Sequence, residues 1–457
     1  APLSGGEAQR IRLAGQLGSK LTGTLYVLDE PTVGLHPRDT ERLLESLLGL
    51  KELGNTVVAV EHDETVMRRA DWVVDIGPGA GRHGGRVVHQ GTPASLEACD
   101  ASLTGAWLRG EASLPRREQR RSTSGAALHI EGVAVHNLRG VEARFPLGVL
   151  TCVTGVSGSG KSSLVLEALV PALRGEQGAW KLRGKEAVKD LIVVDQDALS
   201  ATPTSTAATY VGIWTAVREL FAQTEVARRK GFGPGRFSFN SKEGRCPQCE
   251  GRGELQIEMH FLADVWVRCD LCHGRRFDEQ TLEVRFRDKS IADVLALECG
   301  EAMELFHNQR RIRAPLRTLV DVGLGYLTLG QGLHTLSGGE AQRLKLAAEL
   351  CKPPRPGRVY VLDEPTTGLH MEDTKRLVEV LDKLVDGGAT VIVIEHHMGV
   401  AAAADWVVDL GPEAGPLGGR VVACGSPESF ATATASVTAP HLAAELVRRI
   451  PTVTSHS

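Results

Sequence analysis

Residues 155–163 of this chain read Gly-Val-Ser-Gly-Ser-Gly-Lys-Ser-Ser. The stretch follows an apolar run at 149–153, typical of a strand, and precedes an apolar helical pattern at 164–169. Glycines permit a tight turn whose backbone N–H groups point at phosphate oxygens, with a positive helix N-terminus behind them. The pattern G-x-x-x-x-G-K-[ST] between a strand and a helix therefore predicts a phosphate-binding loop, and disfavours a merely flexible Gly/Ser-rich segment.

Two side chains of this loop have separate expected roles. Lys161 is expected to reach the terminal phosphates of a nucleoside triphosphate, and Ser162 to bind Mg²⁺. The residues expected to hold ATP and Mg²⁺ here are Gly155, Gly158, Gly160, Lys161, Ser162 and Ser163.

The composition limits the class of protein. A length of 457 residues suggests roughly three domains. No apolar run approaches the roughly eighteen residues of a membrane span, so a transporter would need a separate membrane subunit. The net charge of −4 gives no general sign of nucleic-acid binding, so a basic face must be local. Nine cysteines, four in C-x-x-C pairs, and no visible signal peptide indicate a reducing, cytoplasmic compartment. The absence of an initiator Met suggests a truncated chain.

The chain contains an internal duplication. Leu-Ser-Gly-Gly-Glu-Ala-Gln-Arg occurs at 3–10 and at 336–343, and Leu-Asp-Glu-Pro-Thr-x-Gly-Leu-His occurs at 28–36 and at 362–370. The offset is 333 positions at the first pair and 334 thereafter. A register kept this well indicates duplication of a folded unit. The phosphate-binding loop is found only in the second copy, so its counterpart is expected upstream of residue 1.

Each copy begins with a helix-start signal. Ser4 and Ser337 stand at N-cap positions, and the Glu three residues later completes a capping box. Such a box by itself indicates only a helix. The glycines that follow leave N–H groups available to a γ-phosphate. The residues expected to contact nucleotide here are Ser4, Gly5, Gly6, Ser337, Gly338 and Gly339.

Three further strands are expected to end in catalytic groups. The apolar run 359–362 ends in Asp363 and Glu364, at the edge where parallel sheets bind ligands. Asp363 fits a Mg²⁺ ligand, and Glu364 fits the residue that polarises the attacking water. The strand at 390–394 leads to His396, expected to contact the γ-phosphate, and the strand at 191–195 leads to Gln196, expected to sense Mg²⁺ and nucleotide. The predicted catalytic residues are Lys161, Gln196, Glu364 and His396.

Four cysteines have the spacing of a structural zinc site. They are Cys246, Cys249, Cys269 and Cys272, in the pattern C-x₂-C-x₁₉-C-x₂-C. Four thiolates on two short turns give tetrahedral Zn²⁺ a closed site, whereas four unrelated buried thiols are the alternative. The alternation at 254–261 predicts one strand of a hairpin between the two turns.

Two other segments have a distinctive composition. Residues 111–127 have no apolar period and read as a flexible linker, on which Arg116, Arg117, Arg120 and Arg121 are expected to be solvated. Residues 198–209 are rich in Thr, Ser and Ala and are expected to form a loop.

The segment 225–245 has six basic and two acidic residues, interleaved with phenylalanines and glycines. This suits a nucleic-acid contact, and equally a solvated loop whose phenylalanines fill a neighbouring core.

Together these motifs resemble those of tandem ABC-type ATPases. The particular residues within them are similar to those of the UvrA family of bacterial nucleotide excision repair. The narrower features are Leu-Ser-Gly-Gly-Glu-Ala-Gln-Arg, Gly-Arg-Phe-Ser-Phe-Asn at 235–240, and the four-Cys module between the phosphate-binding loop and the second signature. The resemblance covers essentially the whole chain, as about the C-terminal half of such proteins.

The resemblance implies an α/β fold with two ATPase modules arranged head to tail. The first site would join Lys161, Ser162, Gln196, Asp363, Glu364 and His396 to Ser4, Gly5 and Gly6. The other site would use Ser337, Gly338 and Gly339 with Asp29, Glu30 and His62. The resemblance also implies a homodimer on damaged double-stranded DNA, with Lys230, Arg236 and Lys242 as DNA contacts. A UvrB-type helicase is the implied partner, although the region expected to bind it is not in this chain.

The expected domains are residues 1–110, the linker 111–127, the ATPase core 128–224, a signature-domain insertion 225–335 and the closing part 336–457. A UvrA-like paralogue acting in drug or genotoxin tolerance without UvrB is the main alternative. An ABC transporter ATPase would lack the zinc module, and a chromosome-architecture ATPase would have long heptad stretches. A chaperone zinc domain would have more C-x-x-C-x-G-x-G repeats and no phosphate-binding loop.

Overall fold

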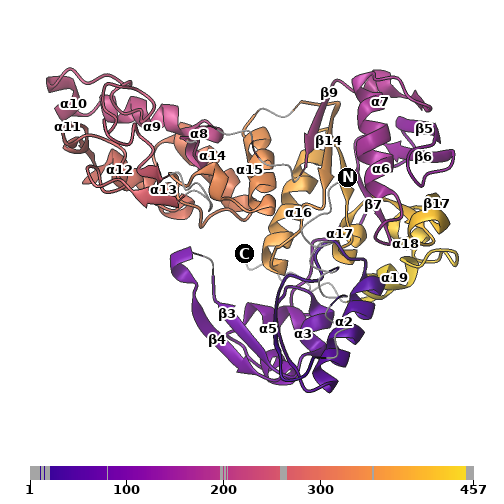
Figure 1. The fold of residues 1–457 in the computed structure, drawn as a ribbon. Coiled ribbons are helices and arrows are strands. Elements are labelled where there is room, and N and C mark those ends of the chain that lie inside the picture. Colours follow the sequence, from indigo (N-terminus) through magenta and orange to yellow (C-terminus); the bar gives the residue numbers. More distant parts are fainter. Residues whose placement is uncertain are drawn as a thin grey trace. The chain divides into compact units, whose positions relative to one another are not determined.

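The computed structural model divides the chain into two compact units, shown in Figure 1. The first comprises residues 1–79, 83–195 and 354–457, and the second comprises 80–82 and 196–353. The structure describes residues 11, 15, 21–79, 81–195, 199, 202, 204–257, 265–352 and 355–448. Among the helices of these residues, none combines the length and the apolar character needed to cross a bilayer. The domain boundaries expected from the sequence remain predictions.

A six-stranded sheet forms the centre of the first unit. Its order is β17-β16-β7-β15-β14-β9, and every neighbouring pair is parallel except β16 with β17. Every residue of β7 and β15 is buried, which explains why β15 is apolar after its first residue. The strands are β7 (Leu150–Gly155), β9 (Asp190–Val194), β14 (Arg358–Asp363), β15 (Thr390–Ile394), β16 (Trp406–Gly411) and β17 (Arg420–Gly425).

Helices and a small antiparallel sheet complete this part of the unit. The sheet has the order β6-β5-β8, with β5 (Ala127–Val133), β6 (Val141–Pro146) and β8 (Lys181–Arg183). Val153 of β7, Ile394 of β15 and Leu410 of β16 belong to the same core as Leu128 and Leu164. The predicted helical pattern at 164–169 forms a π-helical turn, η2 (Val165–Leu169), between α6 (Lys161–Leu164) and α7 (Val170–Arg174). The other helices are α16 (Met371–Asp386), α17 (Met398–Ala403), α18 (Pro427–Phe430) and α19 (Ala439–Val447).

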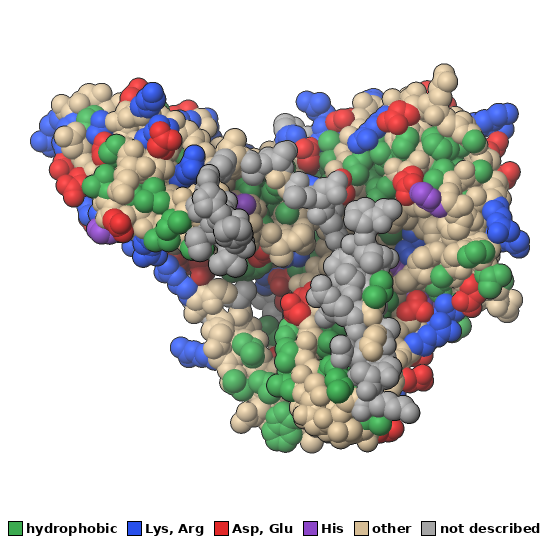
Figure 2. All heavy atoms as spheres, viewed as in Figure 1, with side chains coloured by type: hydrophobic (Ala, Val, Ile, Leu, Met, Phe, Trp, Pro, Cys, Tyr) green, Lys and Arg blue, Asp and Glu red, His purple; other side chains and the backbone are tan. Residues whose placement is uncertain are grey.

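The first sequence copy contributes two separate pairs of strands to the same unit. β1 (Leu25–Asp29) is parallel to β2 (Thr56–Val60), and β3 (Val73–Gly77) is antiparallel to β4 (Arg86–Gly91). Val27 is 68% exposed and Ile76 67% exposed, whereas their repeat partners Val361 and Leu410 are 0% and 1% exposed. Figure 2 shows hydrophobic side chains gathered in the lower part of the view, where Figure 1 places β3 and β4. The helices of this copy are α2 (Pro37–Glu52), α3 (Glu64–Arg69), α4 (Pro93–Glu97) and α5 (Leu103–Leu108).

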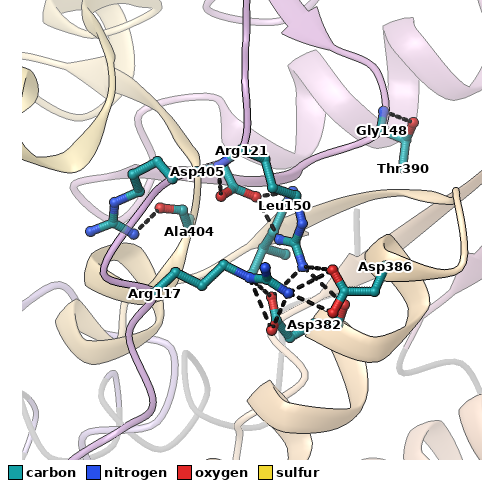
Figure 3. A network of polar contacts seen from close by, with 10 residues as sticks. Arg117, Arg121, Gly148, Leu150, Asp382, Asp386, Thr390, Ala404 and Asp405 are labelled. Carbon is teal, nitrogen blue, oxygen red and sulfur yellow. Dashed lines mark hydrogen bonds and ion pairs between the residues drawn. The ribbon is translucent and has the colours of Figure 1, made fainter.

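The prediction of solvated arginines on the segment 111–127 is wrong. The segment has no helix or strand before Ala127, where β5 begins, but its arginines bind carboxylates of the first unit (Figure 3). Nη1 of Arg121 lies 2.8 Å from Oδ2 of Asp405, whose side chain is only 1% exposed, and Arg117 and Arg121 share Asp382 and Asp386. Arg116 pairs with Glu445 and Arg120 with Glu428. Composition favours a flexible linker here because it does not reveal carboxylates placed hundreds of residues later.

The second unit is mainly helical, with two short hairpins. β10 (Glu254–Ile257) pairs with β11 (Val265–Arg268), confirming the predicted hairpin strand as far as Ile257, and β12 (Arg285–Phe286) pairs with β13 (Lys289–Ser290). The helices are α8 (Ala207–Tyr210), α9 (Ile213–Ala222), α10 (Glu225–Arg229), α11 (Glu279–Leu282), α12 (Ile291–Leu295), α13 (Cys299–Leu305), α14 (Arg310–Asp321) and α15 (Gly338–Leu350).

The loop predicted for residues 198–209 is wrong at its end. α8 begins at Ala207, because Thr206 and Thr209 form a reciprocal capping box. Oγ1 of Thr206 accepts from N–H of Thr209 at 3.3 Å, and Oγ1 of Thr209 accepts from N–H of Thr206 at 2.9 Å.

Candidate functional site

The phosphate-binding loop joins the carboxyl end of β7 to the start of α6. Gly155, Gly158 and Gly160 have φ values of +132°, +75° and +105°, in the region that glycine favours. A Cβ at Gly155 would lie 2.0 Å from the carbonyl oxygen of Leu410. The glycines therefore allow both the turn and the close packing of the loop on β16. Ser162 is exposed and Ser163 half-buried in the first turn of α6.

Lys161 is a buried cation in this loop. Its Nζ donates to the carbonyl oxygens of Gly155 and Val156 at 3.2 and 3.1 Å. Burial lowers the pKa of Lys161 to about 8, against the opposing effect of Glu364 and Asp363. An anionic phosphate at this position would offset the loss of hydration that makes the ammonium unfavourable.

The two predicted acidic residues follow β14, with Asp363 at its last position. Burial, followed by the charge of Glu364, raises the pKa of Asp363 to about 7. Glu364 has a φ of +46°, a left-handed backbone conformation that costs energy in a non-glycine residue. Oε1 of Glu364 lies 3.5 Å from Nε2 of His396, a buried side chain that follows β15. The structure thus brings Lys161, Asp363, Glu364 and His396 together at the carboxyl edge of the sheet.

Glu395 holds two segments of this edge in place. Its carboxylate accepts from N–H and Oγ1 of Thr366 at 2.9 and 2.7 Å, and from N–H of His396 at 3.1 Å. Burial raises the pKa of Glu395 to about 7. Glu395 thus connects the Glu364 loop to the His396 loop, a role that the sequence analysis did not predict.

The first copy repeats this arrangement. Glu61 accepts from N–H and Oγ1 of Thr32 at 2.9 and 2.8 Å, and Nε2 of His62 lies 3.6 Å from Oε1 of Glu30. Glu30 has a φ of +44°, matching Glu364. Asp29 ends β1 as Asp363 ends β14. The sequence repeat could have identified Glu61 and Glu395 as a matched pair, since the two residues lie 334 positions apart, which is the offset of the repeat.

Contacts between the copies lie directly at the carboxylates of Glu364 and Glu30. A Cβ at Gly34 would lie 3.0 Å from Oε2 of Glu364, and a Cβ at Gly368 would lie 3.2 Å from Oε2 of Glu30. Oγ of Ser157, in the phosphate-binding loop, donates to the carbonyl oxygen of Gly34 at 3.1 Å. Each copy therefore supplies a glycine that packs against the other copy's glutamate. Sequence reasoning identified the repeated glycine but not this partner.

The signature residues of the second copy start α15 in the second unit. Oγ of Ser337 accepts from N–H of Glu340 at 3.3 Å, and Oε2 of Glu340 accepts from N–H of Ser337 at 2.8 Å, which confirms the predicted capping box. Gly338 and Gly339 are the first two residues of the helix. Ser4, Gly5, Gly6 and Gln196 lie outside the residues that the structure describes.

The four cysteines form one buried cluster in the second unit. Their Sγ atoms all lie within 4.8 Å of one another, with Cys246 to Cys269 at 3.9 Å and Cys249 to Cys272 at 3.6 Å. Zn–S bonds of about 2.3 Å in a tetrahedron place sulfurs about 3.8 Å apart. The donor set and its spacing therefore fit Zn²⁺.

In the basic segment before this cluster, two phenylalanines fill the core, as one of the two predicted readings expects, and the nucleic-acid reading stays a prediction. Phe237 and Phe239 are 0% exposed and fill the core, whereas the Arg236 guanidinium lies 4.5 Å from the centre of the Phe232 ring. Arg236 pairs with Asp278 at 2.7 Å and Lys230 pairs with Glu283. Lys242 is exposed. The three side chains remain predicted DNA contacts, and two of them also bind carboxylates of their own unit.

Comparison with known proteins supports the same architecture. The family model described as "ABC transporter" matches residues 138–367, half of the chain. The chain belongs to the ABC ATPase family.

The chain is also similar to UvrA proteins in particular, at about 50% sequence identity. UvrABC system protein A from Methanothermobacter thermautotrophicus is 54% identical over 94% of this chain and 45% of its own length. The Thermus thermophilus protein is 52% identical over 99% of this chain and 48% of its own. The crystal structure of UvrA2 from Deinococcus radiodurans has a TM-score of 0.91 and 52% identity, covering 97% of this chain and 55% of that one. The predicted resemblance to the UvrA family is confirmed, and the chain spans about half the length of these relatives.

Proposed function

We propose that this chain belongs to a DNA-binding ATPase that recognises damaged DNA, as the UvrA subunit of nucleotide excision repair. The observation that carries the ATPase part is the convergence of Lys161, Asp363, Glu364 and His396 at one sheet edge. The DNA part rests on the sequence identity to proteins named UvrABC system protein A.

In this proposal the phosphate-binding loop holds the triphosphate of ATP, and Lys161 is charged when it contacts the terminal phosphates. Bound Mg²⁺, with Ser162 and Asp363 as protein ligands, would neutralise charge on the phosphate oxygens. Glu364 orients and polarises the attacking water, and His396 contacts the γ-phosphate. Gln196 is proposed to sense the bound nucleotide.

The second set of residues is proposed to act at the other composite site. Asp29, Glu30 and His62 repeat Asp363, Glu364 and His396, and Ser337, Gly338 and Gly339 present a helix start to phosphate. Ser4, Gly5 and Gly6 would complete the Lys161 site in the same way.

The proposed partners are damaged double-stranded DNA, a second copy in a homodimer and a UvrB-type helicase, in the cytoplasm. Zn²⁺ is proposed to bind Cys246, Cys249, Cys269 and Cys272 as a structural ion. Lys230, Arg236 and Lys242 are proposed to contact the DNA backbone.

The decisive test compares binding to two DNA duplexes of identical sequence, one intact and one with a single bulky adduct. ATP and salt are held constant, because phosphate contacts make affinity strongly salt-dependent. Tighter binding to the adduct supports damage recognition. Equal binding to both duplexes favours the UvrA-like tolerance paralogue. Absence of DNA binding contradicts both.

A further inference from the structure

Two histidines matched by the sequence repeat start equivalent helices in the two copies. His36 is the N-cap of α2, where its Nδ1 accepts from N–H of Arg38 at 3.2 Å. His370 is the N-cap of α16, where its Nδ1 accepts from N–H of Glu372 at 3.1 Å. A backbone N–H can only donate, so each Nδ1 is unprotonated and each neutral ring carries its proton on Nε2.

The Nε2 atom of His36 reaches across to the second copy. It lies 3.1 Å from Oγ1 of Thr438, and the Thr438 hydroxyl donates to Oδ1 of Asp409 at 2.9 Å. The other carboxylate oxygen of Asp409 accepts from Ser436 at 2.6 Å. With Nε2 as donor, every donor in this buried series of hydrogen bonds has one acceptor, and the series ends on a carboxylate.

An equivalent series of hydrogen bonds runs from the second copy to the first. Nε2 of His370 lies 3.3 Å from Oγ1 of Thr104, and Thr104 donates to Oδ1 of Asp75 at 3.0 Å. Ser102 donates to the other oxygen of Asp75 at 2.6 Å. The histidine, aspartate, serine and threonine of one series are each 334 positions from their counterparts in the other series. The duplication thus built two reciprocal links, each with its histidine in one copy and its carboxylate in the other.

The link from His36 ends beside the phosphate-binding loop. Asp409 is paired in β16 with Thr154 of β7, the residue just before Gly155. N–H of His36 also approaches Oγ of Ser157 at 3.4 Å, and Gly34, two residues earlier, packs against Glu364. The segment that contacts Glu364 is therefore attached to the other copy through the His36 ring.

We propose that His36 is a positioning residue for the Lys161 site: through Thr438 and Asp409 it holds Gly34 against the catalytic Glu364. The inference rests on the proposed ATPase function. Burial, followed by the charge of His396, lowers the pKa of His36 to about 3, so the ring stays neutral as the link requires. Loss of the link frees the Gly34 segment and lets Glu364 leave its strained backbone conformation.

The test removes the Thr438 hydroxyl and measures ATP turnover by the full chain. Thr438 makes no side-chain capping bond to α19, so Thr438→Val removes mainly this link. We expect kcat to fall about tenfold, a typical factor for one buried hydrogen bond, with KM changed by less than about twofold. Thr438→Ser, which keeps the hydroxyl, should restore most of the turnover.

Thr390→Val is the matched control. Thr390 is a buried threonine at the start of β15, and its Oγ1 accepts from N–H of Gly148 at 2.8 Å. The change removes a buried hydroxyl without touching the link, so kcat should stay near the wild-type value. Equal kcat in Thr438→Val and Thr390→Val, or a raised KM with unchanged kcat in Thr438→Val, would overturn the proposal.

A second variant and a second measurement separate the link from the ATPase proposal. His36→Asn keeps a preferred N-cap but is too short to reach Thr438, and should lower kcat as Thr438→Val does. Spectra of the chain with isotope-labelled histidine nitrogens should show Nε2–H rings for His36 and His370, and Thr438→Val should change the His36 signal while the His370 signal persists. An Nδ1–H ring at His36 overturns the link even if the chain hydrolyses no ATP, whereas absent turnover with the expected spectra contradicts only the ATPase function.

Discussion

At the scale of single residues, the site is defined by ionisable groups that are buried close together. Lys161 has its Nζ on backbone carbonyls of its own loop, and Asp363 and Glu395 have pKa values raised to about 7 by burial. Burial disfavours the charged form of each group, and a bound phosphate would favour the charged lysine. The unusual protonation of these residues is therefore a property of the site itself.

Lys161→Ala should abolish ATP turnover at this site, because no other side chain replaces the ammonium inside the loop. Steady-state hydrolysis by the purified chain is the measurement. Lys181→Ala changes an exposed lysine of β8 and should leave turnover unchanged. Turnover that persists in Lys161→Ala would contradict the assignment of the site.

The raised pKa of Glu395 predicts a pH dependence of stability. Between pH 4.5 and about 7 the folded chain binds more protons at Glu395 than the unfolded chain. Protonation of Glu395 therefore stabilises the fold, and this contribution is fully present below pH 4.5 and is lost as the pH rises through 7. Glu395→Gln removes this titration. The stability of the wild type relative to Glu395→Gln should fall by up to about 3 kcal/mol across this window, at roughly 1.4 kcal/mol per pH unit. Urea unfolding of both proteins at pH 5 and 7.5 measures this difference, and a pH-independent difference would refute it.

At the scale of elements, residues 111–126 form a docked strap without helix or strand, which leads into β5. Arg121 binds Asp405, and Oδ2 of Asp405 also accepts from N–H of Leu150, the first residue of the strand that leads to the phosphate-binding loop. The Arg121 guanidinium also helps to hold the pKa of Asp386 below its usual range. The strap, which connects the two copies, is thus attached to β7, the strand that leads to the phosphate-binding loop.

Arg121→Ala should destabilise the chain by about 3 kcal/mol, because it leaves the buried Asp405 carboxylate without its cation. The free energy of urea unfolding is the measurement. Arg183→Ala breaks the pair with Glu131, in which the arginine side chain is 71% exposed, and should cost at most about 1 kcal/mol. Similar losses in the two variants would show that the strap pairs behave as surface pairs.

The cysteine cluster should make the β10–β11 hairpin dependent on metal. A hairpin this small has too little core to fold unaided, so metal binding contributes its folding free energy. Metal analysis should find one zinc per chain, and Cys269→Ser should lose the zinc together with protection of the hairpin amides from hydrogen exchange. Cys424→Ser changes an exposed single cysteine and should retain both. A zinc-free wild-type chain with a protected hairpin would exclude the metal role.

At the scale of the whole molecule, duplication produced two copies of one sequence pattern in different surroundings. The strands of the second copy lie inside a six-stranded sheet, whereas their counterparts in the first copy form two separate pairs with exposed apolar faces. The reciprocal contacts at Glu364 and Glu30 nevertheless follow the duplication closely. In the second copy β7 lies between the two equivalent strand pairs, and the part of the chain that the structure describes holds no first-copy counterpart of β7.

The proposed DNA face predicts a local electrostatic effect in a chain of net charge −4. Lys242→Ala should weaken DNA binding and reduce the slope of log affinity against log salt by about 0.9, the value for one phosphate contact. Binding titrations at several salt concentrations measure the slope. Lys51→Ala, at an exposed lysine that pairs with Asp71, should leave it unchanged. Equal slopes in all three proteins would remove Lys242 from the DNA face.

The sequence by itself determined the elements that local pattern and spacing specify. The phosphate-binding loop, the strands ending at Asp363 and before His396, the capping box at Ser337 and the cysteine cluster all follow from turn chemistry, strand apolarity or metal-ligand spacing, which involve residues near one another in the chain. The family could be predicted for the same reason.

Only the tertiary structure decided which distant groups meet. The carboxylates that bind the strap arginines, the Glu395 bonds that join two loops, and the link from His36 to Asp409 all depend on side chains 29 to 402 residues apart. No local pattern encodes such partners, because a hydrogen bond or an ion pair depends on proximity in space. The Glu395 bonds and the His36 link each recur in the other copy, in keeping with the sequence repeat, and the fold determined what each copy contacts.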